Sequence, residues 1–462
     1  MSTRLEKDSL GEKAVPADAY WGIHTQRAME NFPVSGRRFP GRLVRAMALV
    51  KKACCLANLE LGYLDRRLGQ ALGLACEELA EGKLADQFPL DAFQGGAGTS
   101  FNMNVNEVLA NRAIEILGGR KGDYGLVHPL ETVNRHQSTN DTFPTALKIA
   151  SILAFRELSQ TVARLQGACQ RKEKEFAEVI KIGRTELQEA VPITLGAEFA
   201  AFAEAFARDR WRFFKAEERL RVVNLGGTAV GTGLGAPRAY IFLVIEKLRE
   251  LTGLGLCRGE ITLDPTANSD PFVEVSGMLK AHSVNLLKVC NDLRLLNLLG
   301  EIRLPAVQVG SSIMPGKVNP VILESVMQAA LQAQADDFLV TEAAGRASLQ
   351  INEFLPLLAQ VMLDALEMLG NAGRMLTGHL EGVEADPERC LEILARSETL
   401  ITAFLPKLGY ERAGALLREF VAGGGRDLRA FLEERLGRET VARTLSAYNL
   451  TALGHREDEK DA

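Results

Sequence analysis

Residues 310–320 read GSSIMPGKVNP and combine two hydroxyl side chains, two prolines, two glycines, a lysine and an asparagine. Proline interrupts helices and sheet ladders, so the segment predicts a loop and not a core element. Gly316-Lys317 resembles the end of a phosphate-binding loop, but five residues separate Gly310 from Gly316 where that motif has four. Val318 also stands where that motif has Ser or Thr. A bland mobile loop and a binding loop of another kind remain as interpretations.

The composition of the chain excludes several classes of protein. Its 462 residues are 47% hydrophobic and 24% charged with a net charge of −5, which is typical of a soluble globular protein with a large core. No basic tract indicates binding to nucleic acid or to a membrane surface. No run of about 18 apolar residues predicts a membrane span. The N-terminal MSTRLEKDSLGEK lacks the apolar stretch of a secretory signal, so we expect a cytoplasmic protein.

The cysteines, histidines and glycines do not predict a metal or cofactor site. The seven cysteines are odd in number and form no CxxC pair, which predicts free thiols in a reducing compartment. The six histidines are scattered without an HxxxH pair, so we expect no metal. The glycine run NLGGTAVGTGLG (224–235) follows a helix-like stretch, Trp211 to Val222, and not the strand that a dinucleotide-binding loop requires. It predicts a connector between two helices, and we expect no cofactor.

Helical periodicity dominates the middle of the chain. Apolar side chains recur at steps of about three or four in two runs, formed by Phe155, Leu158, Val162 and Leu165 and by Phe199, Phe202, Phe206 and Phe213. Comparable stretches cover about 270–297, 320–340 and 354–378. Helices this long, apolar on more than one side, predict a bundle whose faces are buried between chains. We expect an N-terminal domain at 1–138, a central helical bundle at 139–388 and a small helical domain at 389–462.

Three further polar segments have the character of residues 310–320. They are QGGAGTSFNMNVNE (94–107), HQSTNDTFPT (136–145) and GRTELQEAVPITLG (183–196). Helix capping by Asn140 or Asp141 explains the second segment, and a helix N-terminus beside hydroxyl groups is also a ready anion site. The four segments together suit a small dicarboxylate, because they offer many hydrogen-bond donors around two anionic groups.

GSSIMPGKVNP is similar to the signature of the fumarase/aspartase superfamily, whose lyases eliminate a group beside a carboxylate-bearing carbon to give fumarate. The start of the chain, the polar segments and the glycine run all follow the family's order over nearly the whole length. GGAGTS and QSTND resemble the branch that releases ammonia from L-aspartate, since fumarases typically read SGTQT and QSSND. The resemblance implies a mainly α, three-domain fold with a long central five-helix bundle. It also implies a homotetramer with a twenty-helix core, in which three chains contribute to each active site.

The resemblance further implies roles for individual residues. Ser311 is expected to be the general base, on a loop that closes over the substrate. Contacts to the substrate are expected at the α-carboxylate from Lys317, Asn319 and Thr185, at the β-carboxylate from Thr99, Ser138, Thr139 and Ser312, and at the amino group from Asn140. Arg27 corresponds to a family arginine near the substrate, and a salt bridge away from it is an equally good interpretation.

Two departures from the family pattern leave the substrate open. RLLNLLGEIRLP (294–305) is several residues shorter, around 297–300, than the SGPRAGL-like connection of relatives. Glu186 stands where relatives carry His or Gln, and Glu324 corresponds to the glutamate that pairs with that His. Two facing carboxylates would share a proton or hold a cation. We therefore expect Glu186 to face the substrate amino group or to share a proton with Glu324, and a side chain turned outward to solvent or to a neighbouring arginine is the alternative interpretation.

Alternatives to L-aspartate therefore remain. A related lyase could act on an N-substituted aspartate, or on another amino acid with a different amine leaving group. Fumarase is less favoured by the motifs. A catalytically dead relative, as the lens crystallins of this superfamily show can arise, is disfavoured because Ser311, Lys317 and Asn319 are all present.

Overall fold

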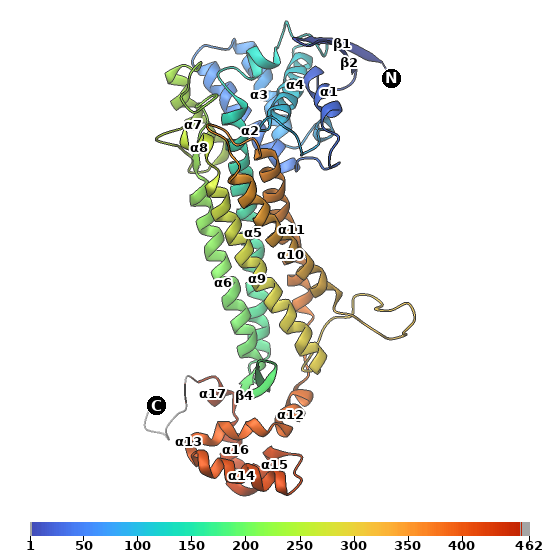
Figure 1. The fold of residues 1–462 in the computed structure, drawn as a ribbon, viewed down its shortest axis with the longest axis vertical. Coiled ribbons are helices and arrows are strands. Elements are labelled where there is room, and N and C mark those ends of the chain that lie inside the picture. Colours follow the sequence, from blue (N-terminus) through green and yellow to red (C-terminus); the bar gives the residue numbers. More distant parts are fainter. Residues whose placement is uncertain (1, 453, 455–462) are drawn as a thin grey trace. The chain divides into compact units, whose positions relative to one another are not determined.

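The computed structural model describes residues 2–452 and 454. The chain divides into two compact units, unit 1 with residues 1–159, 212–281 and 332–369, and unit 2 with residues 160–211, 282–331 and 370–462. The division cuts each of the five longest helices in Figure 1, which are α5 (Thr139–Glu175), α6 (Leu195–Leu220), α9 (Asp270–Leu299), α10 (Val321–Ala344) and α11 (Leu355–Glu381). The predicted mainly α fold with long bundle helices is confirmed, whereas the division into three domains stays a prediction.

Shorter elements complete each unit. Unit 1 contains β1 (Thr3–Asp8), β2 (Gly11–Pro16), α1 (Ile23–Asn31), α2 (Gly41–Glu60), α3 (Arg66–Ala80), η1 (Ala85–Gln87), α4 (Thr99–Ile116), η2 (Pro129–Val133), β5 (Val222–Val223), α7 (Arg238–Thr252), β6 (Cys257–Arg258) and α8 (Asp264–Ala267). Unit 2 contains β3 (Ile180–Thr185), β4 (Gln188–Thr194), β7 (Ile302–Arg303), β8 (Glu384–Ala385), α12 (Pro387–Arg396), η3 (Glu398–Phe404), α13 (Leu405–Leu408), α14 (Tyr410–Ala422), α15 (Leu428–Leu436), α16 (Arg438–Thr444) and α17 (Ala447–Leu450).

The predicted helical stretches agree closely with the structure. The stretches expected at 270–297, 320–340 and 354–378 are α9, α10 and α11. Every apolar side chain of the two periodic runs is buried. In unit 1 the ring of Phe155 on α5 lies 5.7 Å from that of Phe213 on α6. In unit 2 the ring of Phe176, the residue that follows α5, lies 5.4 Å from that of Phe199 on α6, so an aromatic contact also joins the end of α5 to α6 there.

The start of α5 shows why the chain enters this helix at Ser138. The Ser138 Oγ accepts a hydrogen bond from the Asn140 N–H at 3.2 Å, and the Asp141 carboxylate accepts one from the Ser138 N–H at 3.1 Å. Pro144 has no N–H to donate to the Asn140 carbonyl, and the side chain of Asn224 supplies that hydrogen bond at 2.9 Å. Local capping and one long-range bond together fix this helix terminus.

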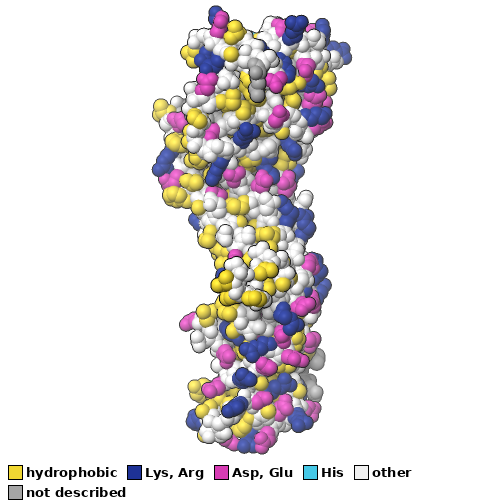
Figure 2. Space-filling view, turned by 90° about the vertical axis from the view of Figure 1, so that its right-hand side faces the viewer, with side chains coloured by type: hydrophobic (Ala, Val, Ile, Leu, Met, Phe, Trp, Pro, Cys, Tyr) yellow, Lys and Arg dark blue, Asp and Glu magenta, His cyan; other side chains and the backbone are white. Residues whose placement is uncertain are grey.

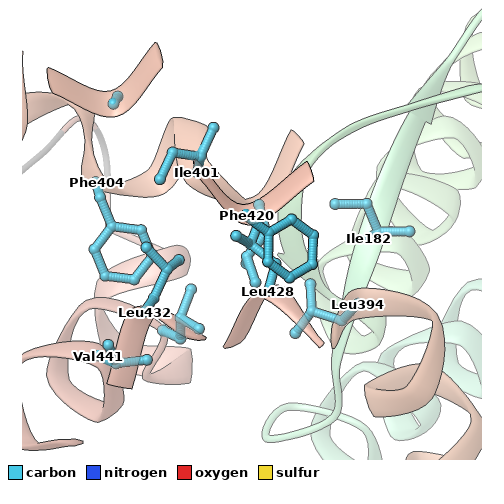
Figure 3. Close-up of a cluster of buried hydrophobic side chains, with 11 residues drawn as sticks. Ile182, Leu394, Ile401, Phe404, Phe420, Leu428, Leu432 and Val441 are labelled. Carbon is cyan, nitrogen blue, oxygen red and sulfur yellow. The ribbon is translucent and has the colours of Figure 1, made fainter. Parts of the chain in front are cut away.

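The C-terminal helices of unit 2 pack on the β3–β4 hairpin. Ile182 of β3 joins a buried cluster with Leu394 of α12, Phe404 of η3, Phe420 of α14 and Leu428 of α15, as Figure 3 shows. β3 and β4 pair antiparallel from Ile180–Thr194 to Thr185–Gln188, with an irregularity between Ile182 and Arg184. The base of the hairpin is therefore anchored in a hydrophobic core, while the residues of its turn are exposed.

The glycine run forms a connector between α6 and α7, as predicted. The helix before it ends at Leu220, so the expectation of a helix through Val222 is wrong. Residues 222–223 form a parallel strand pair with residues 257–258. This pairing requires an extended backbone at 222–223, so the helix ends before them. Gly231 has a φ of +88°, and a Cβ there would lie 2.5 Å from backbone atoms of residues 262–263, so close packing requires glycine.

The cysteines and the apolar helices can be compared with the sequence expectations directly. All seven cysteines are free, and only Cys257 is exposed, in agreement with the predicted free thiols. Within the described part of the chain, no helix combines the length and the apolar character that crossing a bilayer requires.

Candidate active site

The first polar cluster lies in unit 1, where α4 and α5 begin side by side. Gly98, just before α4, has a φ of +92°, and a Cβ there would lie 2.5 Å from the Phe143 ring on α5. Asn102 of α4 donates a hydrogen bond to the Thr139 hydroxyl of α5 at 3.0 Å. The structure thus brings the predicted residues Thr99 and Thr139 onto adjacent helix N-termini, where backbone N–H groups and the helix dipole favour an anion.

Asn140 already uses one end of its amide. Its Nδ2 donates to the carbonyl of Ala229, in the glycine-rich connector, at 2.7 Å. The Asn140 Oδ1 is the remaining polar atom of this amide, and it can only accept a hydrogen bond. This orientation suits the predicted contact to a substrate ammonium group, which can only donate.

Asp141 fastens the same connector to α5. Its Oδ2 accepts hydrogen bonds from the backbone N–H groups of Gly226 at 3.2 Å and Thr228 at 2.9 Å. The side chain is fully buried, and burial raises the pKa of Asp141 to about 7. The connector that the sequence assigned to a purely structural role therefore supports the backbone around Ser138, Thr139 and Asn140.

A buried lysine lies beneath this cluster and was missed by sequence reasoning. Lys51 of α2 is 1% exposed and donates to the side-chain oxygens of Asn134 at 3.0 Å and Gln137 at 2.9 Å. Asn102 also donates to Asn134, at 3.2 Å, and so links Lys51 to Thr139. Burial lowers the pKa of Lys51 to about 8. Nothing in the sequence around Lys51, inside an amphipathic helix, marks it as part of a polar network.

The second cluster is the 304–320 segment of unit 2, which extends as a long loop between β7 and α10 (Figure 1). The Ser311 Oγ accepts hydrogen bonds from the N–H groups of Ile313 at 3.2 Å and Met314 at 3.0 Å. Gly310 N–H donates to the Lys317 carbonyl at 2.7 Å, and the Asn319 side chain donates to the Gly310 carbonyl at 2.9 Å. These contacts close the loop on itself and hold Ser311 at its neck.

Glycine is required at the neck of this loop. A Cβ on Gly310 would lie 2.7 Å from the Lys317 carbonyl oxygen and 2.9 Å from the Asn319 nitrogen, both backbone atoms that cannot move aside. Ser312 and Lys317 are exposed, and Ser311 is half-buried. The loop therefore presents Ser312 and Lys317 outward, whereas the side chains of Ser311 and Asn319 form hydrogen bonds with its own backbone.

The third cluster is the turn of the β3–β4 hairpin in unit 2. Glu186 and Leu187 form a two-residue connection with φ values of 54° and 62°, as expected for a tight hairpin turn. Thr185 and Glu186 are both exposed, and Glu324 is half-buried in the first turn of α10. Within residues 2–452, no hydrogen bond or ion pair joins Glu186 to Glu324, so the predicted proton sharing between them stays a prediction.

Arg27 is engaged in a salt bridge in unit 1. Its guanidinium donates to both carboxylate oxygens of Asp8, on β1, at 2.8 and 2.9 Å, and to the Gly11 carbonyl at 3.1 Å. The pairing holds the pKa of Asp8 below its ordinary value. Of the two interpretations of Arg27, this geometry supports the salt bridge.

The predicted site residues thus fall into two groups in one chain. Unit 1 holds Thr99, Ser138, Thr139, Asn140 and Arg27, and unit 2 holds Thr185, Glu186, Ser311, Ser312, Lys317, Asn319 and Glu324. Among the residues that the structure describes, no group of three or more His, Cys, Asp or Glu side chains could hold a metal ion. The available chemistry is that of hydroxyl, amide and ammonium groups around helix N-termini and tight turns.

Known proteins resemble this chain over almost its full length. A family model described as a lyase matches residues 11–335. The aspartate ammonia-lyase of Bacillus subtilis (strain 168) is 43% identical over 459 residues, which cover 98% of this chain and 96% of the relative. The aspartate ammonia-lyase of Escherichia coli (strain K12) is 41% identical over 461 residues, covering 98% and 96%.

Solved structures agree with the fold. A fumarate lyase:delta crystallin from Brucella melitensis bound to cobalt has a TM-score of 0.93 at 44% identity, covering 98% of this chain and 100% of that chain. A class II fumarase from Schistosoma mansoni has a TM-score of 0.88 at 31% identity, covering 96% and 98%. With the helical bundle, the polar segments and these matches in agreement, the chain belongs to the fumarase/aspartase superfamily of lyases.

Proposed function

We propose that the protein is a carbon–nitrogen lyase that eliminates ammonia from L-aspartate to give fumarate. Relatives named aspartate ammonia-lyase are 41–46% identical to this chain over most of its length. The single observation in the structure that carries the proposal is the environment of Ser311. Its Oγ receives two backbone N–H donors at the neck of an otherwise exposed loop.

The reaction requires a base for a very weak carbon acid. A proton leaves the carbon next to the β-carboxylate, and the resulting aci-carboxylate dianion forms only if its charge is stabilised. A serine can accept this proton only as an oxyanion, in a closed and dry site of positive potential. The N–H groups of Ile313 and Met314 already point at the Ser311 Oγ and would stabilise that negative charge.

The remaining predicted residues divide between the two ends of the substrate. The ammonium of Lys317 and the side chains of Asn319 and Thr185 bind the α-carboxylate in this proposal. The β-carboxylate, where charge grows in the transition state, is bound by Thr99, Ser138, Thr139 and Ser312. The Asn140 Oδ1, left as an acceptor by its bond to Ala229, receives the amino group. Adjacent helix N-termini at Thr99 and Thr139 support the β-carboxylate assignment.

A second candidate is a related lyase that acts on an N-substituted aspartate, or on another amino acid with a different amine leaving group. The observation that favours it is Glu186, whose carboxylate is exposed at the turn beside Thr185. A carboxylate there would repel the α-carboxylate of aspartate, by roughly 4 kcal/mol at about 4 Å and an effective dielectric near 20. It would attract a cationic leaving group with similar strength.

The same proposal includes assembly into a homotetramer whose active sites are shared by three chains. Apolar side chains are exposed on the bundle helices, including Phe338 of α10 at 62% and Leu298 of α9 at 79%. Figure 2 shows apolar side chains, in yellow, interspersed with charged ones over the face it presents. Burying such residues against further copies of the chain would supply a hydrophobic interface. We further propose that the enzyme acts in the cytoplasm.

Ultraviolet absorbance of fumarate tests the proposed reaction directly. The purified protein is incubated separately with L-aspartate, malate, argininosuccinate and N-substituted aspartates, and kcat/KM is compared. The proposal expects L-aspartate to give the highest value. A higher value with an N-substituted aspartate would favour the second candidate, a higher value with malate would favour fumarase, and no fumarate from any of them would contradict lyase activity.

A further inference from the structure

A buried ion cluster in unit 2 lies directly behind the turn that carries Thr185. Its centre is Glu301, which follows α9, has a fully buried side chain and precedes β7. The Arg184 guanidinium donates to the Glu301 Oε1 at 2.8 Å, and the Lys181 ammonium lies 2.9 Å from the Oε2. Both cations belong to β3, on either side of its irregularity between Ile182 and Arg184, so one carboxylate binds this strand at two points.

The cluster is balanced in charge. Lys181 also pairs with Glu198 of α6 at 2.7 Å, so that two cations face two carboxylates. The Lys181 and Glu301 side chains are 2% and 0% exposed, and an uncompensated charge at such a position is strongly unfavourable. Arg184 bridges further to the Ile182 carbonyl at 3.3 Å, which ties the charge to the strand backbone at its irregularity.

The backbone of Glu301 is fixed as firmly as its side chain. Its N–H donates to the Leu296 carbonyl at 3.0 Å, and its carbonyl accepts from the Asp386 N–H at 2.9 Å. These two hydrogen bonds connect Glu301 to the last turn of α9 and to the residue before α12. Arg184 is the residue immediately before Thr185. Its hydrogen bond to Glu301 therefore constrains the direction in which the Thr185 hydroxyl points.

We propose that Glu301 is a positioning residue for the lyase reaction. It acts through Arg184 to orient the β3–β4 turn, so that the Thr185 hydroxyl meets the substrate α-carboxylate. This inference rests on the proposed function, since it assumes that Thr185 binds substrate. Glu301 itself is buried and does not touch the substrate. Because the α-carboxylate is bound equally in the ground state and in the transition state, loss of the positioning raises KM more than it lowers kcat.

Glu301→Gln is the principal variant, and its KM for L-aspartate is expected to rise by about tenfold with kcat changed by less than about threefold. Glu198→Gln is the matched control, because it removes one carboxylate from the same cluster without touching Arg184. Its KM is expected to stay within about twofold of wild type. Where Glu301→Gln does not yield folded protein, Arg184→Lys, which keeps the charge and loses the planar fork, is measured in its place.

A double-mutant cycle with Thr185→Val separates positioning from general loss of stability. If Glu301 acts through Thr185, the Glu301→Gln change has little further effect on KM once Thr185 is valine. An unchanged KM in the single variant, or a rise of equal size in the Thr185→Val background, overturns the proposal.

Hydrogen exchange of the β3–β4 backbone in the full-length protein gives a readout that does not depend on the reaction. Exchange at residues 184–189 is expected to accelerate in Glu301→Gln and not in Glu198→Gln. If the wild-type protein forms no fumarate but this acceleration is seen, the proposed function fails while the positioning contact stands. Unchanged exchange in the turn overturns the positioning role whatever the substrate is.

Discussion

Replacing Ser311 by alanine separates a catalytic contribution from a structural one. The change removes the acceptor of two backbone N–H groups, at 3.2 and 3.0 Å, in a segment whose residues 312–318 are exposed. Water can take the place of that acceptor, so the free energy of unfolding should fall by less than about 1 kcal/mol. A general base contributes about 10²–10⁴-fold to the rate, or about 3–5 kcal/mol of transition-state stabilisation. The loss of activity should therefore greatly exceed the loss of stability.

The assay compares fumarate formation from L-aspartate with urea unfolding of the same preparations. Ser348→Ala is a matched control, because Ser348 is also an exposed serine and its hydroxyl bonds only locally, to Glu353. The control should keep kcat/KM within about twofold of wild type. A Ser311→Ala protein within about tenfold of wild type would refute the base assignment. A large loss of stability would refute the view that the hydroxyl has no part in packing.

Four further predictions concern other parts of the site. Lys317→Ala should raise KM, because it removes a charged partner of the α-carboxylate, and should also lower kcat, because Lys317 lies on the loop that carries Ser311. An unchanged KM would contradict the binding role. Ser311→Ala and Thr185→Val subunits, each with low activity alone, should regain part of the activity when they are unfolded and reassembled together, if each site draws on several chains. A verified mixed tetramer as inactive as its parents would exclude shared sites. If Glu186 recognises a cationic leaving group, Glu186→Gln should lower kcat/KM for the true substrate by about tenfold or more and shift the pH profile, whereas unaltered kinetics would remove Glu186 from the site. Asp141 has a native pKa of about 7 against an ordinary value of 3.8, so its contribution to stability falls as pH rises between these values. Urea unfolding should show this decline in the wild type and not in Asp141→Asn, and parallel curves would contradict it.

The long helices could be predicted because their apolar side chains repeat with the period of a helix and are in fact buried. The polar segments could be found because clusters of glycine, proline, serine and threonine are unfavourable inside such helices and so indicate loops or helix ends. The end of α6 was misplaced by about two residues, since Val222 fits a helical pattern as well as it fits a strand. Only the distant partner strand at Cys257–Arg258 decides between the two.

The support of the site could not be predicted, because it depends on contacts between residues far apart in the chain. Asn140 is oriented by a hydrogen bond to the carbonyl of Ala229. Every residue has a backbone carbonyl, so the sequence does not indicate which one is the acceptor. Lys51 and Asn102 lie inside helices, where single polar residues usually face solvent. Glu301 lies in the 294–305 segment, whose only unusual feature in the sequence is that it is shorter than the corresponding connection of relatives. Local patterns thus locate reactive side chains, whereas their orientation is a property of the folded units.

The β3–β4 hairpin contains residues that the fold restricts strongly and, a few positions away, residues that it restricts weakly. Its base is held by Ile182 in a hydrophobic core and by the ion pairs of Lys181 and Arg184, whereas Glu186 and Leu187 at its turn are exposed. Their positive φ values favour Gly, Asn or Asp, and both side chains are exposed among the residues that the structure describes. Mutations at these two positions can therefore accumulate without passing through unstable intermediates. In evolution, and in a library made by directed mutagenesis, this turn is the place where substrate preference can diverge while the fold is inherited unchanged.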